Sequence, residues 1–262
     1  MVGGKTVMNY LTYPMKTMRI TQNYKGKTSH YPHTVGTPKD YPIDEGGKDT
    51  GRDGFYCPCD EVKIVRVYGV GSGGTNTLWI ESTQKVHFAD GTCDYACGLI
   101  THPNDTDIKN LYVGRKFRQG DLICKEGTDG ATANHLHISF GKGKFKGNGW
   151  KKNTRSKYVL DCTGGACKPE SLFYIDPDFT EVMSKGDIDF KNLPEDYAVG
   201  TYKVNTAVLN VRKGAGTNFA KVGTLVKGRK IKVVETDGIW GRIADKKWVC
   251  LEYCKKEQVM KK

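Results

Sequence analysis

The sequence predicts a mainly β protein, with an antiparallel β-sheet and long loops followed by a small C-terminal β-barrel. The chain has 262 residues, of which 32 are glycine. Glycine is more frequent than the roughly 7% of ordinary proteins, which favours turn-rich β structure over helix bundles. Hydrophobic residues make up 37% of the chain, enough for a packed core. No long stretch has the 3.6-residue period of an amphipathic helix.

Strand-like segments are spread through the first two thirds of the chain. Residues 62–68 (VKIVRVY), 77–81 (TLWIE) and 135–140 (HLHISF) alternate apolar and polar side chains or are rich in β-branched residues, as strands are. Glycine- and aspartate-rich clusters separate them and predict loops. Residues 172–183 (LFYIDPDFTEVM) end this part with aromatic packing residues. We therefore expect a first domain at residues 1–183.

The remaining chain changes character. Residues 184–199 are polar, locally acidic and contain Pro194, which predicts a linker. Residues 200–262 then form a second domain with a basic tail. Its expected strands, separated by glycine-containing turns, are residues 202–211, 220–226, 230–236, 240–243 and 248–251. Several short strands in so few residues predict a small closed or nearly closed barrel.

The formal net charge of +12 suggests a polyanionic partner such as nucleic acid, an anionic membrane surface or an acidic cell-wall polymer. Residues 200–262 hold 15 Lys and Arg against 5 Asp and Glu, a net charge of +10, whereas residues 1–199 carry +2. The basic excess therefore belongs to the C-terminal domain. It informs where the protein goes rather than which reaction the first domain performs.

The distribution of apolar residues bears on location. No apolar run approaches the roughly 18 to 20 residues that span a bilayer, so we expect no stable membrane insertion. Residues 1–21 lack the apolar core that follows a basic start in a signal peptide. We therefore expect synthesis in a cytoplasm without a signal peptide, and action outside the cell only after release by another factor.

The cysteine pattern does not indicate a disulfide framework. Nine cysteines are an odd number, and no paired C-x-x-C knuckles signal a structural zinc ribbon. We expect reduced, mostly buried thiols. A disulfide between Cys93 and Cys97, or between Cys162 and Cys167, is the alternative.

Two of the six histidines, His135 and His137, are separated by one residue in an expected strand. Residues two apart in a strand project to the same face, and neighbouring imidazoles suit a metal such as zinc. The H-x-H pattern alone is a weak signal, because two polar residues on a solvated strand face produce it as well. The glycine-rich loop that leads directly into this strand strengthens the metal interpretation.

Three regions together resemble the LytM/lysostaphin family of zinc metallopeptidases. Residues 29–33 (SHYPH) and 41–45 (YPIDE) provide a histidine followed by an aspartate that is preceded by an aliphatic residue. Residues 101–103 (THP) provide an isolated histidine, and residues 127–140 (GTDGATANHLHISF) a glycine-rich segment ending in HLH. The resemblance covers roughly residues 20–140 and is most specific in the last segment. It implies that the antiparallel sheet is a zinc peptidase domain.

The resemblance implies a role for five side chains. Zn²⁺ would be held by His33, Asp44 and His137, which leaves a fourth position for water, as catalytic zinc sites require. His135 would be the general base that takes a proton from the attacking water, and His102 would orient that water and stabilise the oxyanion. His102 and His135 are therefore the expected catalytic residues.

The spacing departs from the family pattern at one point. Ten residues separate His33 from Asp44, where the family has three, so an inserted loop is needed and His30 remains an alternative first ligand. We favour His33 because it is nearer to the aspartate. Asp40 is a weaker rival to Asp44, since only Asp44 follows an aliphatic residue. His87 falls at an expected hairpin tip, and we expect it to lie on the surface.

The C-terminal domain looks like a bacterial SH3-like domain. The opening NTAVLNVRKGAGTN at residues 205–218, the VGTL segment at 222–225 and the GIWGRI hairpin at 238–243 fall in the family's order over nearly all of residues 200–255. Such domains typically bind bacterial cell-wall peptides or associated polymers. Trp240, Trp248 and Tyr253 are the expected wall-binding residues. For the two tryptophans, and above all for Trp240, a place in the core of the barrel is the alternative.

A LytM-type peptidase joined to an SH3-like wall-binding domain resembles the build of phage endolysins. We expect a zinc-dependent endopeptidase that hydrolyses an amide bond in the stem or cross-bridge peptides of bacterial peptidoglycan and so lyses the wall. Its partners would be peptidoglycan and anionic wall polymers, and the chain would be a monomer. The alternative is an inactive wall-binding scaffold or an activator of another wall hydrolase. A nucleic-acid partner is not expected, because charge alone leaves the histidines unexplained.

Overall fold

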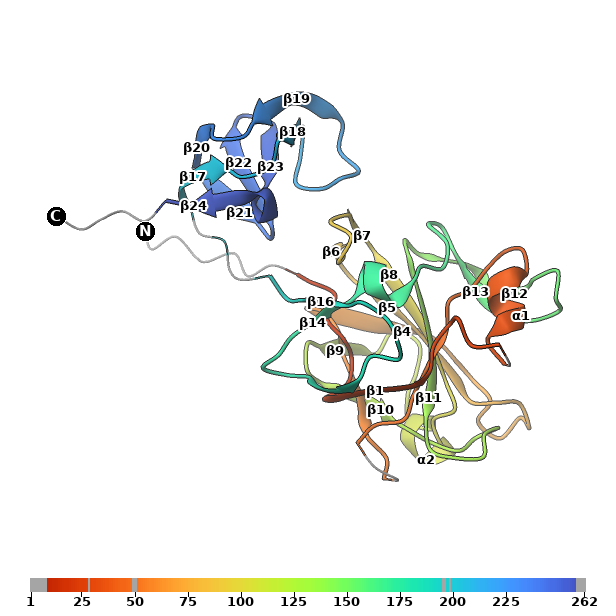
Figure 1. Cartoon of the computed structure of the whole chain (residues 1–262). Coiled ribbons are helices and arrows are strands. Elements are labelled where there is room, and N and C mark those ends of the chain that lie inside the picture. Colours follow the sequence, from red (N-terminus) through yellow and green to blue (C-terminus); the bar gives the residue numbers. More distant parts are fainter. Residues whose placement is uncertain (1–8, 28, 49–50, 195–196, 198, 258–262) are drawn as a thin grey trace. The chain divides into compact units, whose positions relative to one another are not determined.

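The computed structural model describes residues 9–27, 29–48, 51–194, 197 and 199–257 and divides the chain into two units (Figure 1). The first unit comprises Asn9–Asp90 and Asp94–Leu193, and the second contains the chain from Pro194 onward. Both are built mainly of antiparallel strands, so the expected mainly β fold class is confirmed.

The elements of the first unit are mostly short strands, joined by long connections. In chain order they are β1 (Thr17–Gln22), α1 (Tyr31–Val35), β2 (Ile43–Glu45), β3 (Gly54–Tyr56), β4 (Glu61–Tyr68), β5 (Thr77–Ser82), β6 (Val86–His87), β7 (Cys93–Asp94), β8 (Ala96–Thr101), α2 (Asp105–Ile108), β9 (Lys116–Arg118), β10 (Leu122–Lys125), β11 (Leu136–Lys142), β12 (Phe145–Lys152), β13 (Tyr158–Cys162), α3 (Pro169–Leu172), β14 (Tyr174–Ile175), β15 (Glu181–Ser184) and β16 (Lys191–Asn192). The three strands expected from the sequence correspond to β4, β5 and β11.

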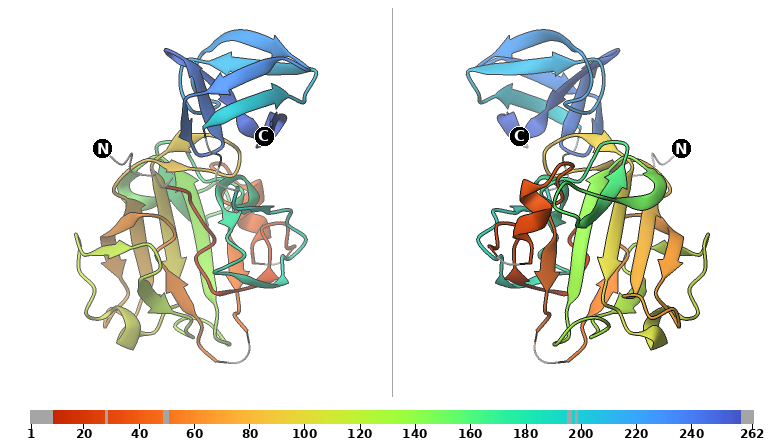
Figure 2. Two further views of the ribbon diagram at one scale, coloured as in Figure 1. Left: turned by 90° about the vertical axis from the view of Figure 1, so that its left-hand side faces the viewer. Right: turned by 90° about the vertical axis from the view of Figure 1, so that its right-hand side faces the viewer.

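One eight-stranded sheet organises the first unit. Its order is β15-β1-β2-β11-β8-β5-β4-β9, and every neighbouring pair is antiparallel except β1 with β15. Figure 2 shows this sheet from two further sides. Strands far apart in the sequence therefore become neighbours: β2 lies between β1 and β11, although some 90 residues separate β2 from β11.

Alternation along β11 separates a core face from a second face of the sheet. Leu136, Ile138 and Phe140 are buried in the main hydrophobic core, whereas His137 and Ser139 project to the opposite face. This is the two-residue period expected of a strand. Burial of the apolar residues on one face of the sheet therefore determines that His137 and Ser139 project from the other face.

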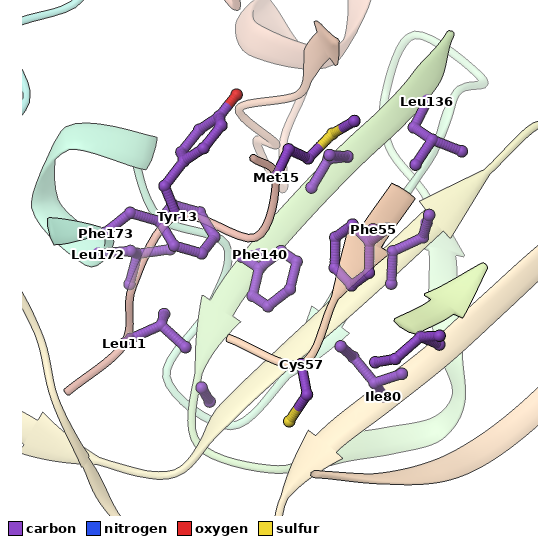
Figure 3. Packing of buried hydrophobic residues seen from close by; sticks show 14 of the residues in the cluster. Leu11, Tyr13, Met15, Phe55, Cys57, Ile80, Leu136, Phe140, Leu172 and Phe173 are labelled. Carbon is purple, nitrogen blue, oxygen red and sulfur yellow. The ribbon is translucent and has the colours of Figure 1, made fainter. Parts of the chain in front are cut away.

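Aromatic and aliphatic side chains from the N-terminal segment and from α3 cover the core face. Phe140 lies between Phe173, at 5.0 Å between ring centroids, and Phe55, at 6.4 Å (Figure 3). Leu11 and Met15 pack into the same cluster and are fully buried. This packing holds β11 in place through apolar burial, the main stabilising contribution in such a core.

The opposite face is covered only in part. The β12–β13 hairpin buries Trp79, Leu99 and Leu160 in a smaller hydrophobic cluster. Beyond this cluster the face carries the polar residues of β2, β8 and β11, and it is here that the candidate site lies.

The segment expected to be a linker belongs partly to the first unit. Residues 184–193 stay with this unit, because Ile188 and Phe190 are buried in its main core and β16 pairs with β14. Two isolated apolar residues in a polar stretch are enough to anchor it, although they leave no strand-like pattern in the sequence. Residues 195, 196 and 198 of the expected linker lie outside the described residues.

The expectation that His87 lies on the surface is wrong. His87 is buried, and the backbone of β6 is hydrogen-bonded to the N-terminal segment through Asn9 and Leu11. The pairing of a distant segment with this strand buries what the local sequence marks as a hairpin tip. The nine cysteines are free thiols, and six of them are buried.

The second unit consists of two small sheets, and its buried apolar residues form a main cluster and a smaller one. Its elements are β17 (Gly200–Val204), β18 (Val208–Arg212), β19 (Lys221–Val226), β20 (Lys230–Val233), β21 (Glu235–Asp237), β22 (Trp240–Ala244), β23 (Lys247–Cys250), η1 (Leu251–Tyr253) and β24 (Cys254–Lys256). The sheets have the orders β20-β17-β24 and β19-β18-β23-β22-β21. Two of the expected strands are each divided in two, at residues 205–207 and at Val234.

Across the described residues, no helix has the length and apolar character that a membrane-spanning helix requires.

Substituting Gly98 by Ala should destabilise the first unit. Gly98 in β8 pairs with Phe140 in β11, and an added Cβ would lie 2.2 Å from the Phe140 ring. We expect a loss of about 1–3 kcal/mol, the usual cost of overpacking, measured by calorimetric unfolding. In a double-mutant cycle, Phe140→Leu should recover part of this loss. Strict additivity of the two changes would contradict the assigned contact.

Candidate metal centre and its flanking pockets

A row of register pairs across four strands sets the positions of the central side chains. Gln22 of β1 pairs with Asp44 of β2, Asp44 pairs with His137 of β11, and His137 pairs with Thr101 of β8. Residues paired across neighbouring strands project to the same face. Asp44 and His137 are therefore adjacent, and the distance from His137 Nδ1 to Asp44 Oδ1 is 3.0 Å.

His30 completes a cluster of three possible metal ligands. It is the N-cap residue of α1, and its Nε2 lies 3.1 Å from Asp44 Oδ1. Ligand atoms of His30, Asp44 and His137 all lie within 4.8 Å of one another. Two imidazole nitrogens and one carboxylate oxygen are a donor set that zinc accepts, and three protein ligands leave a fourth position open.

The hydrogen bonds of His30 favour a cation at this point. Its Nδ1 lies 2.9 Å from the carbonyl oxygen of Asn23, which only accepts, so the proton of neutral His30 is on Nδ1. The lone pair of Nε2 then faces the anionic oxygen of Asp44. Either a second proton on the ring, donated to Asp44 as a hydrogen bond, or a divalent cation bound by both groups removes this repulsion. A ligand histidine that donates its other N–H to a backbone carbonyl is also the usual arrangement in metal sites.

Asp44 is held by its neighbours in the ionised state. Burial alone would raise the pKa of its carboxyl group, but the hydrogen bonds with His137 and His30 outweigh burial and hold the pKa well below its usual range. Its other oxygen, Oδ2, accepts a hydrogen bond from Gln22 Nε2 at 3.0 Å. Gln22 thereby fixes which oxygen faces the histidines.

The structure places His30, and not the favoured His33, in the ligand cluster. His33 lies one turn further along α1, with its ring centroid 5.8 Å from that of His137 and 6.5 Å from that of His30. Its Nδ1 is buried and has no hydrogen-bond partner among the described residues. Burial, followed by the electrostatic effect of the neighbouring His137 and His30, lowers the pKa of His33 to about 4. The helical turn brings the more distant residue to the metal position, which linear spacing does not reveal.

The two histidines expected to be catalytic lie side by side next to the cluster. The ring centroids of His102 and His135 are 4.6 Å apart, and His135 Nε2 lies 4.0 Å from Asp44 Oδ1. Each donates its Nδ1 proton to a carbonyl oxygen: His135 to Ala133 at 2.9 Å and His102 to Asp129 at 2.7 Å. In its neutral state, each ring therefore presents Nε2 as a lone pair.

The position of His102 depends on an unusual backbone conformation. His102 directly follows β8 and has a φ of 83°, in the left-handed region that non-glycine residues seldom adopt. Its amide donates to the carbonyl of Asn76, and its own carbonyl accepts from the amide of Asp129. Burial lowers the pKa of His102 to about 4, so the ring is neutral at physiological pH.

Asp40, the weaker rival for the ligand role, has a structural one. It is 3% exposed, and its carboxylate accepts hydrogen bonds from the amides of Tyr41 and Leu160. Burial raises the pKa of its carboxyl group. It therefore ties the β13 strand to the segment before β2 and is not part of the three-residue ligand cluster.

A pocket of about 510 Å³ lies on one side of the cluster. His102 and His137 line it, and its wall includes the aromatic side chains of Tyr68, Trp150 and Tyr158. The Trp150 ring centroid lies 5.4 Å from that of Tyr68 and 4.8 Å from that of Tyr158. This pocket therefore offers a wall of three aromatic rings next to the histidines.

A second pocket of about 530 Å³ lies on the other side and is lined by Asp44 and His135. Arg19 and Thr21 from β1 and Thr128 and Thr132 from the loop before β11 form much of its wall. We call the first pocket the aromatic pocket, after its three rings, and the second the polar pocket, because no Phe, Tyr or Trp lines it. A cation lines each pocket, Lys157 the aromatic one and Arg19 the polar one. Sequence reasoning missed both walls, because β1 and β12 carry no motif and reach the site only through sheet order and the β12–β13 hairpin.

Two buried carboxylates lie behind the second pocket. Glu45 accepts hydrogen bonds from the Tyr13 hydroxyl and the Arg19 amide, and Glu126 accepts one from the Asp53 amide. Burial raises the pKa of Glu45 to about 7 and that of Glu126 to about 8. Both groups therefore hold a proton at pH values where an exposed glutamate has lost it.

The expected wall-binding residues of the second unit differ in exposure. Trp240 is 3% exposed and packs in a small cluster with Ala215, Ile239 and Cys250, so it presents no surface to a ligand. The prediction for Trp240 is therefore wrong, because the hairpin that carries it turns the ring inward. Trp248 is partly buried against the same cluster, and Tyr253 is 52% exposed.

Residues 207–253 match the family described as bacterial SH3 domain, which confirms the resemblance drawn from the C-terminal motifs. Among solved structures, the chain is similar to the antimicrobial peptidase lysostaphin from Staphylococcus simulans, with 16% identity, coverage of 89% of this chain and 87% of that chain, and a TM-score of 0.35. It is similar to lysostaphin in solution, with 15% identity, coverage of 94% and 93%, and a TM-score of 0.33. It is also similar to Csd3 of Helicobacter pylori, with 17% identity, coverage of 61% and 34%, and a TM-score of 0.32. No curated protein matches the chain.

Metal content should distinguish His30 from His33. We expect His30→Ala to retain less than about a tenth of the zinc bound by the unmodified chain after dialysis, because it removes one of three ligands. His33→Ala, a histidine removed from the same helix, should bind zinc stoichiometrically. Zinc would be measured by inductively coupled plasma mass spectrometry. Zinc lost from His33→Ala and retained in His30→Ala would reverse the assignment.

Substituting Glu126 by Gln should flatten the pH dependence of stability. The folded-state pKa of about 8 lies above the ordinary value of 4.5. Between these values the folded chain holds a proton that the unfolded chain has released, so stability falls as the pH rises through this window. We expect the unmodified chain to lose on the order of 1–3 kcal/mol between about pH 5 and about pH 8, and the variant less. Equal slopes in calorimetric unfolding of the two would contradict this.

Proposed function

We propose that the chain is a zinc-dependent peptidoglycan endopeptidase that hydrolyses an amide bond in stem or cross-bridge peptides. One observation carries the proposal. The donor atoms of His30, Asp44 and His137 converge on one point, and two further imidazoles beside them present free Nε2 lone pairs. This arrangement provides a metal position and two acceptors for a water proton in the same place, which is what metal-assisted amide hydrolysis requires.

Zn²⁺ held by these three residues would polarise the scissile carbonyl group and lower the pKa of a nearby water molecule. The chain's own residues would carry out the proton transfers. His135 accepts the proton of the attacking water at Nε2, because its Nδ1 proton is engaged with the Ala133 carbonyl. The resulting imidazolium then donates this proton to the leaving amine nitrogen.

The hydrogen bond from His102 to Asp129 refines the role of His102. With its proton on Nδ1 and a pKa of about 4, His102 is an acceptor at Nε2 at neutral pH. An acceptor suits the orientation of the attacking water and does not suit the stabilisation of an oxyanion, which needs a donor. We therefore assign His102 to water orientation alone.

A peptide substrate would cross the cluster from one pocket to the other. The aromatic pocket would receive one side of the scissile bond against Trp150 and Tyr158, and the polar pocket the other side. Pockets on both sides of the metal position favour an endopeptidase over an enzyme that removes only terminal residues. The substrate peptide can then contact the protein on each side of the scissile bond.

The bacterial SH3 unit would bring the peptidase to the wall. Its net charge of +10 suits anionic wall polymers, and the exposed Tyr253 remains a candidate contact residue. Tethering to the polymer raises the local substrate concentration without any new contact in the active site. A peptidase domain joined to such a domain is the build of phage endolysins, so we propose action on the host wall after release from the cytoplasm in which the chain is made.

Substituting His135 by Ala should separate catalysis from metal binding. We expect hydrolysis of purified peptidoglycan to fall by about 10²- to 10⁴-fold through loss of the general base, with zinc content unchanged. Substituting His137 by Ala should remove both. Rates would be followed by turbidity, and mass spectrometry of the released fragments would name the bond. If the unmodified zinc-loaded chain binds walls and releases no fragments, it is an inactive scaffold, and the proposal fails.

A further inference from the structure

The polar pocket contains a cation, Arg19, whose side chain makes no ion pair among the described residues. Arg19 lies in β1 between the buried residues Met18 and Ile20, so its side chain projects away from the core and lines the pocket beside Asp44 and His135. The pairing of β1 with β15 is irregular between Met18 and Arg19. Such irregularities re-aim side chains and are frequent next to active sites.

The guanidinium group of Arg19 has no hydrogen bond or ion pair within the described part of the chain, although its backbone amide donates to Glu45. The residue is half-buried. An Arg side chain that is partly removed from water and unpaired is costly to maintain, unless a ligand supplies the missing anion.

Nearby carboxylates are engaged elsewhere. Asp44 accepts hydrogen bonds from Gln22 and the cluster histidines, and the oxygens of Glu45 accept from the Tyr13 hydroxyl and the Arg19 amide. The carboxyl group of Glu126 interacts with Arg19 electrostatically, but it accepts from the Asp53 amide and makes no ion pair with Arg19. The N–H donors of the Arg19 guanidinium group therefore remain available to bind a ligand in the polar pocket, which would receive one side of the substrate. A planar fork of N–H donors matches a carboxylate in a two-point contact.

We propose that Arg19 is a specificity-determining residue that pairs with a free carboxylate on the substrate residue bound in the polar pocket. The preferred substrate is thus an acidic peptide, and its carboxamide counterpart is disfavoured because a neutral amide leaves the guanidinium uncompensated. This inference rests on the proposed peptidase function and adds to it which peptides the site selects.

Amidation of the wall tests the proposal. Peptidoglycan stripped of phosphate-containing polymers, so that carboxylates are its anions, is divided in two, and one half is converted to carboxamides with carbodiimide and ammonium. Initial rates are measured on both for the full zinc-loaded chain, Arg19→Gln, and Arg118→Gln. Arg118 is the matched control. It is an exposed arginine in β9, which lies at the edge of the sheet opposite to β15, and it lines neither pocket.

The compared quantity is the ratio of the rates on unmodified and amidated walls. Comparing this ratio between variants cancels the effect of amidation on the SH3 unit, which is common to all of them. We expect the unmodified chain and Arg118→Gln to favour the unmodified wall by about 10- to 100-fold, the range of a charge-assisted hydrogen-bonded pair. Arg19→Gln should lose most of this preference through slower cleavage of the unmodified wall. Arg19→Lys, which retains charge without the fork, should fall between them.

Equal ratios for Arg19→Gln and the unmodified chain would overturn the assignment of Arg19. A ratio near one for the unmodified chain would overturn carboxylate selection altogether. Zinc content and calorimetric unfolding verify that Arg19→Gln is folded and loaded, so a lost preference cannot reflect a damaged site. No cleavage of either wall by the unmodified chain would instead refute the peptidase function.

Discussion

The pairing of β2 with β11 is the constraint on which the site depends. The register that places Asp44 opposite His137 also buries Ile43, Leu136 and Ile138 on the other face. A shift of one residue would turn the carboxylate and the imidazole toward the core and expose the apolar set. The free energy of apolar burial thus maintains the geometry of the polar cluster, and the polar residues need not stabilise the fold themselves.

Backbone carbonyl groups determine the protonation pattern of the histidines that lie in and beside the cluster. The carbonyls of Asn23, Asp129 and Ala133 each accept the Nδ1 proton of one histidine and so determine which ring nitrogen is free. All three belong to loops, whereas Asp44 and His137 belong to strands. The sheet positions two of the three ligands, Asp44 and His137, and loop carbonyls determine which nitrogen of His30, His102 and His135 is free.

Local pattern was sufficient for much of this structure. Alternation identified β4, β5 and β11, and the HLH segment identified the strand that carries His135 and His137. Spacing could not choose between His30 and His33, because a helical turn that no periodicity marks decides between them. Burial of His87 and Trp240, and the placement of Arg19 beside the cluster, follow from pairing between distant segments, which one sequence does not display.

The attachment of α1 links metal binding to the shape of the groove. This short helix carries His30 at its start and His33 in the wall of the aromatic pocket, and the Asn153 side chain ties it to the turn of the β12–β13 hairpin through the Pro32 carbonyl. An interaction that holds His30 close to Asp44 therefore also stabilises the wall of the aromatic pocket that His33 forms. If zinc and a peptide bind as proposed, occupancy of the metal position and order in the groove would be thermodynamically linked. Substrate would then help to retain the metal as much as the metal prepares the site for substrate.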